Sequence, residues 1–100
     1  MLAHNVYFTL KDNSDQARQA LVEGCKKYLN EHPGTKSFAV GTLAEGLERP
    51  VNDRDFDVGL HLIFETRQAH DDYQKHARHI EFVEQHQDNW ERARVFDTDL

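Results

Sequence analysis

The sequence is poor in the residues that stabilise small secreted proteins or mark a membrane segment. It contains one cysteine, Cys25, two prolines and one tryptophan. A single cysteine excludes a disulfide within the chain and is compatible with a reducing compartment. No apolar run approaches the roughly 18 residues of a membrane-spanning helix, and the N-terminus lacks the pattern of a signal peptide. We therefore expect a cytoplasmic protein that makes no membrane contact.

Positive charge is also scarce. The chain has 12 Lys and Arg against 18 Asp and Glu, for a net charge of −6 at pH 7. A polyanionic partner would need a local basic patch, and the candidates, Lys26-Lys27 and Arg92 with Arg94, are small. An RNA-recognition motif places basic and aromatic residues on its middle strands, whereas FDVGLHLIF (residues 56–64) has no lysine or arginine. We expect no nucleic-acid partner.

The hydrophobic pattern changes period along the chain. Alternation predicts strands over residues 4–10, 36–42, 56–64 and 90–96. Apolar residues at three-and-four spacing predict a helix over 15–30. A second helix is expected after Thr66, with a weaker helical continuation over 79–89. The third strand should turn one wholly apolar face to the core: Phe56, Val58, Leu60, Leu62 and Phe64.

This order of elements predicts an α+β fold. Strand, helix, strand, strand, helix, strand is the ferredoxin-like βαββαβ arrangement, an antiparallel four-stranded sheet with both helices on one face. The length of 100 residues suits one domain, 1–100. The opposite face should carry a partly apolar set: Tyr7, Ala39, His61, Ile63, Ala93 and Val95. Because such faces usually mark interfaces, we expect a homodimer joined sheet to sheet.

The local motifs, taken in this order, resemble the stress-responsive dimeric α/β-barrel family, called Dabb. The resemblance covers nearly the whole chain. It rests on His4, Pro33-Gly34, Val40-Gly41, Phe56-Asp57-Val58-Gly59-Leu60, Phe64, Tyr73-x-x-His76-x-x-His79 and Phe96-Asp97. It implies a dimeric α/β barrel and a small cavity between the sheet and the helices.

The resemblance also implies roles for particular residues. One plant branch of the family acts as a polyketide cyclase, and Tyr73 and His79 correspond to its acid–base pair. The residues that would line the cavity are His4, Tyr28, His76 and Trp90. The sequence departs from the family at Ala77, a position where proline is common. Most members look like stress-linked proteins with no assigned chemistry.

The residues themselves leave two alternatives open for the helix motif. An imidazole near a phenol can act as an acid–base pair. Alternatively, Tyr73 packs in the core and the histidines bond to helix-end carbonyls. His76-x-x-His79 lacks the one-turn spacing of a helical zinc pair, so we assign no metal ligand and no cofactor. We expect the remaining helix-flanking histidines to lie at the surface: His32, His70 and His86.

Three functional hypotheses remain. The first is a small dimeric stress-responsive protein that binds a small hydrophobic or aromatic molecule without turnover. The second is a cofactor-free, polyketide-cyclase-like lyase that uses Tyr73 and His79. The third is a self-association module whose function is the dimer. The first is the leading prediction, and enzymatic activity stays open.

Overall fold

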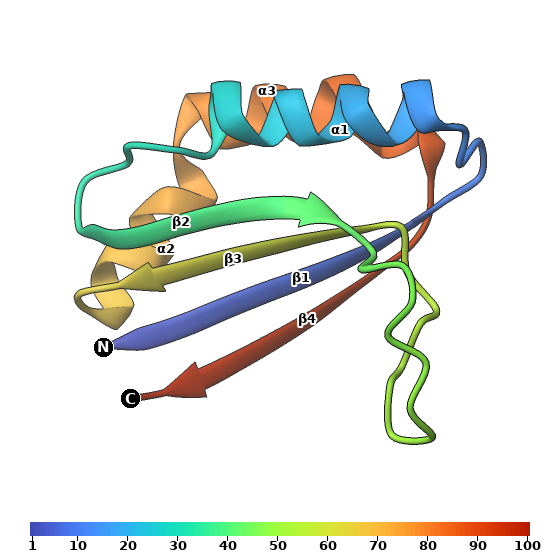
Figure 1. Ribbon diagram of the computed structural model, residues 1–100. Coiled ribbons are helices and arrows are strands. Elements are labelled where there is room, and N and C mark those ends of the chain that lie inside the picture. Colours follow the sequence, from blue (N-terminus) through green and yellow to red (C-terminus); the bar gives the residue numbers. More distant parts are fainter.

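The computed structural model describes residues 1–100 as one antiparallel sheet with all its helices on one face (Figure 1). The elements are β1 Leu2–Leu10, α1 Asp15–Tyr28, β2 Thr35–Thr42, β3 Val58–Phe64, α2 Arg67–Lys75, α3 Ala77–His86, the 3-10 turn η1 Gln87–Asn89, and β4 Trp90–Asp99. The strand order is β2-β3-β1-β4. This confirms the predicted ferredoxin-like fold. None of the helices has the length and apolarity to cross a bilayer.

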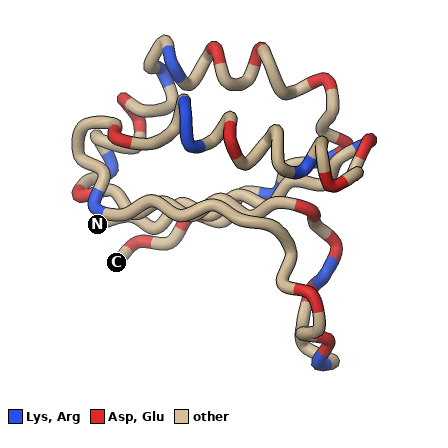
Figure 2. The backbone as a smooth tube through the Cα atoms, turned by 45° about the horizontal axis from the view of Figure 1, so that its top comes forward, with Lys and Arg blue, Asp and Glu red and all other residues tan.

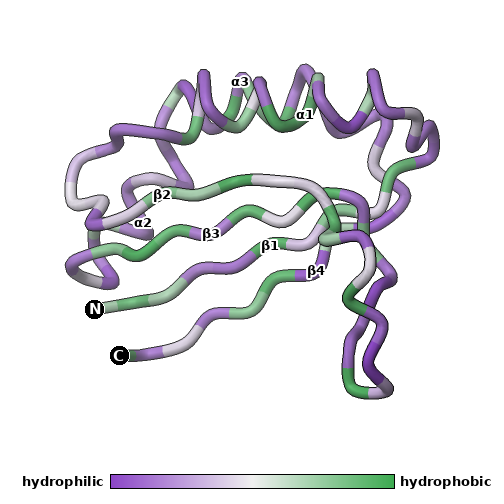
Figure 3. The backbone as a smooth tube through the Cα atoms, in the orientation of Figure 1, coloured by the Kyte–Doolittle hydropathy of each residue, from purple (hydrophilic) through white to green (hydrophobic).

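Strand alternation builds the core. Every second residue of β1 is buried, from Leu2 to Leu10, while the residues between are half-exposed. Val6, Phe8 and Leu10 join buried side chains of β3 and of the helices in one cluster of 14 buried residues. In Figure 3 the hydrophobic segments of α1 and α3 face the sheet and the hydrophilic ones face outward. The core therefore lies between the sheet and its helices.

The second predicted helix is two helices separated at His76. Thr66 caps α2 by accepting the Ala69 N–H. His76 has extended backbone angles (φ −65°, ψ 143°), and its Nδ1 accepts the Arg78 N–H at 3.1 Å, which caps α3. His76 thus ends α2 and caps the start of α3. The break between the helices forms although residue 77 is alanine and not the proline that is common in the family.

The pairing of β4 with β1 corrects one part of the predicted open face, the sheet face opposite the helices. Val95 pairs with Val6 in the β1–β4 ladder, and paired residues of an antiparallel ladder project to the same face. Val95 and Ala93 therefore lie on the helix side. Arg94 and Phe96 occupy the open face instead. In ERARVFD, residues 91–97, each of the two alternating sets of residues contains apolar side chains, so the sequence does not show which set faces the helices. Only the register with β1 assigns the two faces.

Phe56 is a second correction, because it does not face the core. It precedes β3, and its ring packs on Tyr7 at the open face, with ring centroids 4.9 Å apart. The neighbouring Asp57 is buried, and its Oδ2 accepts the Leu10 N–H at 2.8 Å. This bond fixes an irregular backbone ahead of β3, which turns Phe56 to the other side. Residues 43–57, which connect β2 to β3 and include Phe56 and Asp57, form an arm that projects away from the helices (Figure 1).

Candidate functional site

A pocket of about 160 Å³ lies between the sheet and the helices α2 and α3. Of its 13 lining residues, 10 are hydrophobic. The polar remainder is His4, Gln74 and His79, and Tyr73 adds a phenol. An apolar hollow with a few convergent polar groups is the usual form of a small-molecule site.

Four of the six predicted site residues line this pocket: His4, Tyr73, His79 and Trp90. The other two do not. Tyr28 is buried, with its hydroxyl 3.5 Å from Glu81 Oε1.

His76 is exposed, and the structure gives it a different role from the predicted one. Its Nδ1 caps α3, and its ring packs on His32 with centroids 4.8 Å apart. The predicted placement of Tyr28 and His76 in the cavity is corrected here, because neither residue lines the pocket: Tyr28 bonds to Glu81, and His76 is engaged by the α3 cap and by His32.

The helix break brings Tyr73 and His79 together. Tyr73 lies on α2 and is 2% exposed, and His79 lies on the first turn of α3. Their ring centroids are 4.8 Å apart and their planes meet at 76°. On one straight helix, two three-residue steps would separate these side chains by roughly 120°. The extended backbone of His76 removes that separation, so both side chains reach one pocket.

Burial keeps both groups uncharged near neutral pH. Burial, together with the nearby charges of His32, His4 and His70, lowers the pKa of His79 to about 4. Burial also raises the pKa of the Tyr73 phenol well above its usual range. The pair therefore presents a neutral imidazole, which can accept a proton, beside a protonated phenol, which can donate a hydrogen bond.

His4 is held by a carboxylate that the sequence analysis did not assign to the site. His4 is 3% exposed, and its Nδ1 lies 2.6 Å from Asp97 Oδ1. Burial lowers the pKa of His4, and the hydrogen bond and charge of Asp97 oppose that shift. Because an ionised carboxylate only accepts, the His4 proton sits on Nδ1 and its Nε2 keeps a lone pair. The two residues are partners in the β1–β4 ladder.

The three histidines expected at the surface are all partly or fully buried. His32 is 4% exposed, its Nε2 lies 2.7 Å from the Tyr28 carbonyl oxygen, and its ring packs on Tyr73. His70 is half-buried, 4.9 Å from the His4 ring. His86 packs over Gly24, where an added Cβ would collide with its imidazole. A helix-period count could have placed His70 beside Tyr73, since they are three residues apart.

The fold and this pocket define a class: ferredoxin-like α+β proteins with a site between the sheet and the helices. The sequence also matches the stress responsive A/B barrel domain, Dabb, over residues 2–100. The chain belongs to that family. No curated protein matches its sequence.

Solved structures share this fold at low sequence identity. A dimeric ferredoxin-like protein of unknown function from Thermobifida fusca is 17% identical, with a TM-score of 0.81, and the match covers 99% of this chain and 90% of that one. A Dabb family protein from Mesorhizobium loti is 24% identical, with a TM-score of 0.79 and coverages of 99% and 95%. The hydroxynitrile lyase of Passiflora edulis is 19% identical, with a TM-score of 0.77 and coverages of 99% and 92%.

Proposed function

We propose that residues 1–100 act as one cytoplasmic domain that binds a small hydrophobic or aromatic molecule in the pocket. The observation that carries the proposal is an apolar hollow with Tyr73 and His79 at one end. An engineered apolar cavity of about 150 Å³ holds benzene. A volume of about 160 Å³ thus suits one ring.

The polar groups narrow the chemistry of the ligand. The Tyr73 phenol donates a hydrogen bond, and the neutral His79 imidazole accepts one, so the ring should carry a hydroxyl or carbonyl group. Larger substituents would leave the pocket beside Val95, which lines it and is 52% exposed. A phenol therefore suits the site better than benzene does.

Titration of the ¹⁵N-labelled protein with phenol tests the proposal. We expect amide shifts around Tyr73 and His79, and weaker binding in His79→Ala because the acceptor is lost. A loss of about 1 kcal/mol, or roughly fivefold in Kd, is typical of one hydrogen bond. His86→Ala is the matched control, since His86 lies outside the pocket lining and away from the open face. Shifts confined to the open face, or equal Kd values for both variants, would contradict the proposal.

We infer that the protein is a homodimer joined through the open face. Three aromatic rings meet there: Phe56 and Phe96 pack on Tyr7, with centroids 4.9 and 5.9 Å away. Two hollows of about 390 and 440 Å³ flank Tyr7 on this face. Such an exposed aromatic patch favours association, and the Thermobifida fusca relative is described as dimeric.

A second candidate function is a cofactor-free lyase or cyclase reaction. The observation that favours it is the neutral His79 held against Tyr73, and the Passiflora edulis relative is named as a hydroxynitrile lyase. For a hydroxynitrile, His79 would take the hydroxyl proton while the bond from carbon to the nitrile breaks, which gives a carbonyl compound and cyanide, and the protonated His79 would then return the proton to cyanide. Tyr73 would donate a hydrogen bond to the substrate oxygen where negative charge develops. No other reactive group is required for this step.

Cleavage of an aromatic hydroxynitrile tests the second candidate. We expect His79→Ala to lower kcat by about 10²–10⁴-fold, the usual contribution of a positioned acid or base. Tyr73→Phe should keep the ring in place and lose the hydrogen bond. His86→Ala is the control, because His86 lies outside the pocket lining. Turnover that is equal in the wild type and His79→Ala would refute this function and leave ligand binding untouched.

A further inference from the structure

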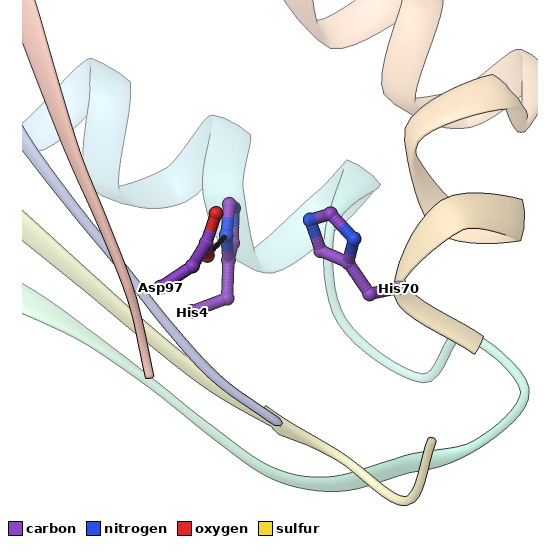
Figure 4. A group of neighbouring side chains, drawn as sticks. All are labelled: His4, His70 and Asp97. Carbon is purple, nitrogen blue, oxygen red and sulfur yellow. Dashed lines mark hydrogen bonds and ion pairs between the residues drawn. The ribbon is translucent and has the colours of Figure 1, made fainter. Parts of the chain in front are cut away.

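A second polar group lies beside the pocket and is formed by His4, His70 and Asp97 (Figure 4). The three side chains come from β1, α2 and β4. One donor atom from each lies within 4.8 Å of the others. Figure 4 shows the His70 ring reaching toward His4 from the helix side, with Asp97 against His4 on the strand side. Two imidazoles and a carboxylate therefore converge from separate elements.

The hydrogen bonds of His70 determine its tautomer. Its Nδ1 lies 3.1 Å from Asp71 Oδ1, and this carboxylate accepts the Nδ1 proton. The lone pair then sits on Nε2, which accepts a hydrogen bond from the side-chain nitrogen of Gln74 at 3.3 Å, and a bound ion would replace that bond. A carboxylate behind the imidazole is the arrangement that orients histidines in metal sites. His70 is thus held in the ligand tautomer by the residue that follows it.

Burial differs across the group in a way that suits an ion arriving from water. The His4 side chain is 3% exposed and that of His70 is 16% exposed. The Asp97 side chain is 43% exposed. The two imidazoles are thus fixed in the protein, and the carboxylate faces the route from solvent.

We propose that His4, His70 and Asp97 bind one divalent transition-metal ion, which takes the place of the proton shared by His4 Nδ1 and Asp97 and releases it to solvent. Two nitrogens and one carboxylate oxygen suit borderline ions such as Zn²⁺, Co²⁺ and Ni²⁺ better than Mg²⁺ or Ca²⁺, which prefer oxygen. Three protein ligands leave a position open for water or for a bound molecule. Because His4 also lines the pocket, the ion would sit at its wall.

The site goes beyond the proposed ligand binding and does not depend on it, because Tyr73 and His79 are not among its ligands. The notable sequence pair, His76-x-x-His79, contributes nothing to it. His4 and Asp97 meet only through the β1–β4 register, 93 residues apart in sequence. No local spacing could have shown this set.

Calorimetric titration of chelator-treated protein with Zn²⁺ tests the proposal, and the visible absorption of added Co²⁺ reports the coordination. We expect one ion per chain. His70→Ala and Asp97→Asn should each weaken binding by at least about tenfold, the lower end of losses around metal sites. His86→Ala, which changes a histidine packed over Gly24 and outside this group, should bind as the wild type does. Circular dichroism verifies that each variant is folded.

Three results would overturn the proposal: no stoichiometric Zn²⁺ binding by the wild type, unchanged affinity in His70→Ala, or an equal loss in His86→Ala. The last would mean binding by histidines outside the proposed site. If His70→Ala fails to fold, Asp97→Asn decides the matter, because the Asp97 side chain is 43% exposed and its replacement leaves the packing intact.

Discussion

The two faces of the sheet use aromatic side chains for different ends. On the helix face Phe8, Phe64 and Phe82 are at most 3% exposed and form the core. On the open face Phe96 is 52% exposed, although it packs on Tyr7. Figure 2 shows the charged residues mainly on the helices and on the arm 43–57, and few along the middle of the strands. One face thus builds the protomer and its pocket, and the other remains available to a second copy.

The largest expected effect separates the two faces with one type of substitution. Phe64→Ala should lower the free energy of unfolding by about 3–5 kcal/mol, because it removes a buried ring from a packed core. Phe96→Ala should instead weaken the dimer by about 2 kcal/mol, the effect of an interface hot spot. Denaturation of both variants at several protein concentrations measures the two quantities.

Concentration dependence decides how this pair of results is read. The loss in Phe64→Ala should be the same at every concentration, whereas the loss in Phe96→Ala should act through the dissociation constant. If light scattering gave equal dimer dissociation constants for Phe96→Ala and the wild type, the open face would not be the interface.

A loss of stability of intermediate size is expected when the histidines on the helix side of the sheet are protonated. His79 has a pKa of about 4 in the folded protein, against about 6.5 when unfolded. Protonation therefore favours the unfolded chain, so stability is full above about pH 6.5 and declines toward pH 4. The His79 share of the slope is at most about 1.4 kcal/mol per pH unit.

Thermal melts from pH 7 to 4.5, with His79→Gln beside the wild type, measure that share. The variant should show the shallower decline, because it lacks one group that takes up a proton on unfolding. Burial lowers the pKa values of His4, His32 and His86 in the same direction, so some slope should persist. Equal slopes in the two proteins would mean that His79 is not buried as described.

The smallest effect concerns the contact between α1 and α3. Gly24→Ala would drive a Cβ into the His86 imidazole, and overpacking of this kind costs about 1–3 kcal/mol. The gain in helix propensity returns about 1 kcal/mol. We expect a net loss of about 1 kcal/mol in the wild type and a gain of similar size in a His86→Ala background. A double-mutant cycle by urea denaturation measures the change of sign.

Local patterns predicted the order of the elements because the pattern that specifies each helix or strand lies within its own contiguous residues. The alternation of residues 4–10 and the helix stripe of 15–30 specify their own structure and their own buried side. The faces of β4 could not be assigned that way, since Ala93 and Val95 alternate with Arg94 and Phe96 equally well. Its pairing with β1 decides the matter, and a bulge between Thr9 and Leu10 shifts even that register.

The site was predictable only in part. The Tyr73 and His79 pair came from the family resemblance, and the structure places both in one pocket. The contributions of His32 and Asp97 arise from contacts between elements, so their neighbours in sequence do not indicate them, whereas the three-residue spacing of His70 and Tyr73 is visible in the sequence. The cap at His76 is likewise a side-chain hydrogen bond, which periodicity cannot show.

The strand order also determines where this protein could aggregate. β2 and β4 each have one neighbour in the sheet, and an unpaired strand edge is a template for fibril growth. The last strand, β4, carries charges along its whole length: Glu91, Arg92, Arg94, Asp97 and Asp99. Burying these charges in a stacked edge would be costly. The charges of β4 therefore make this edge a poor template for open-ended aggregation.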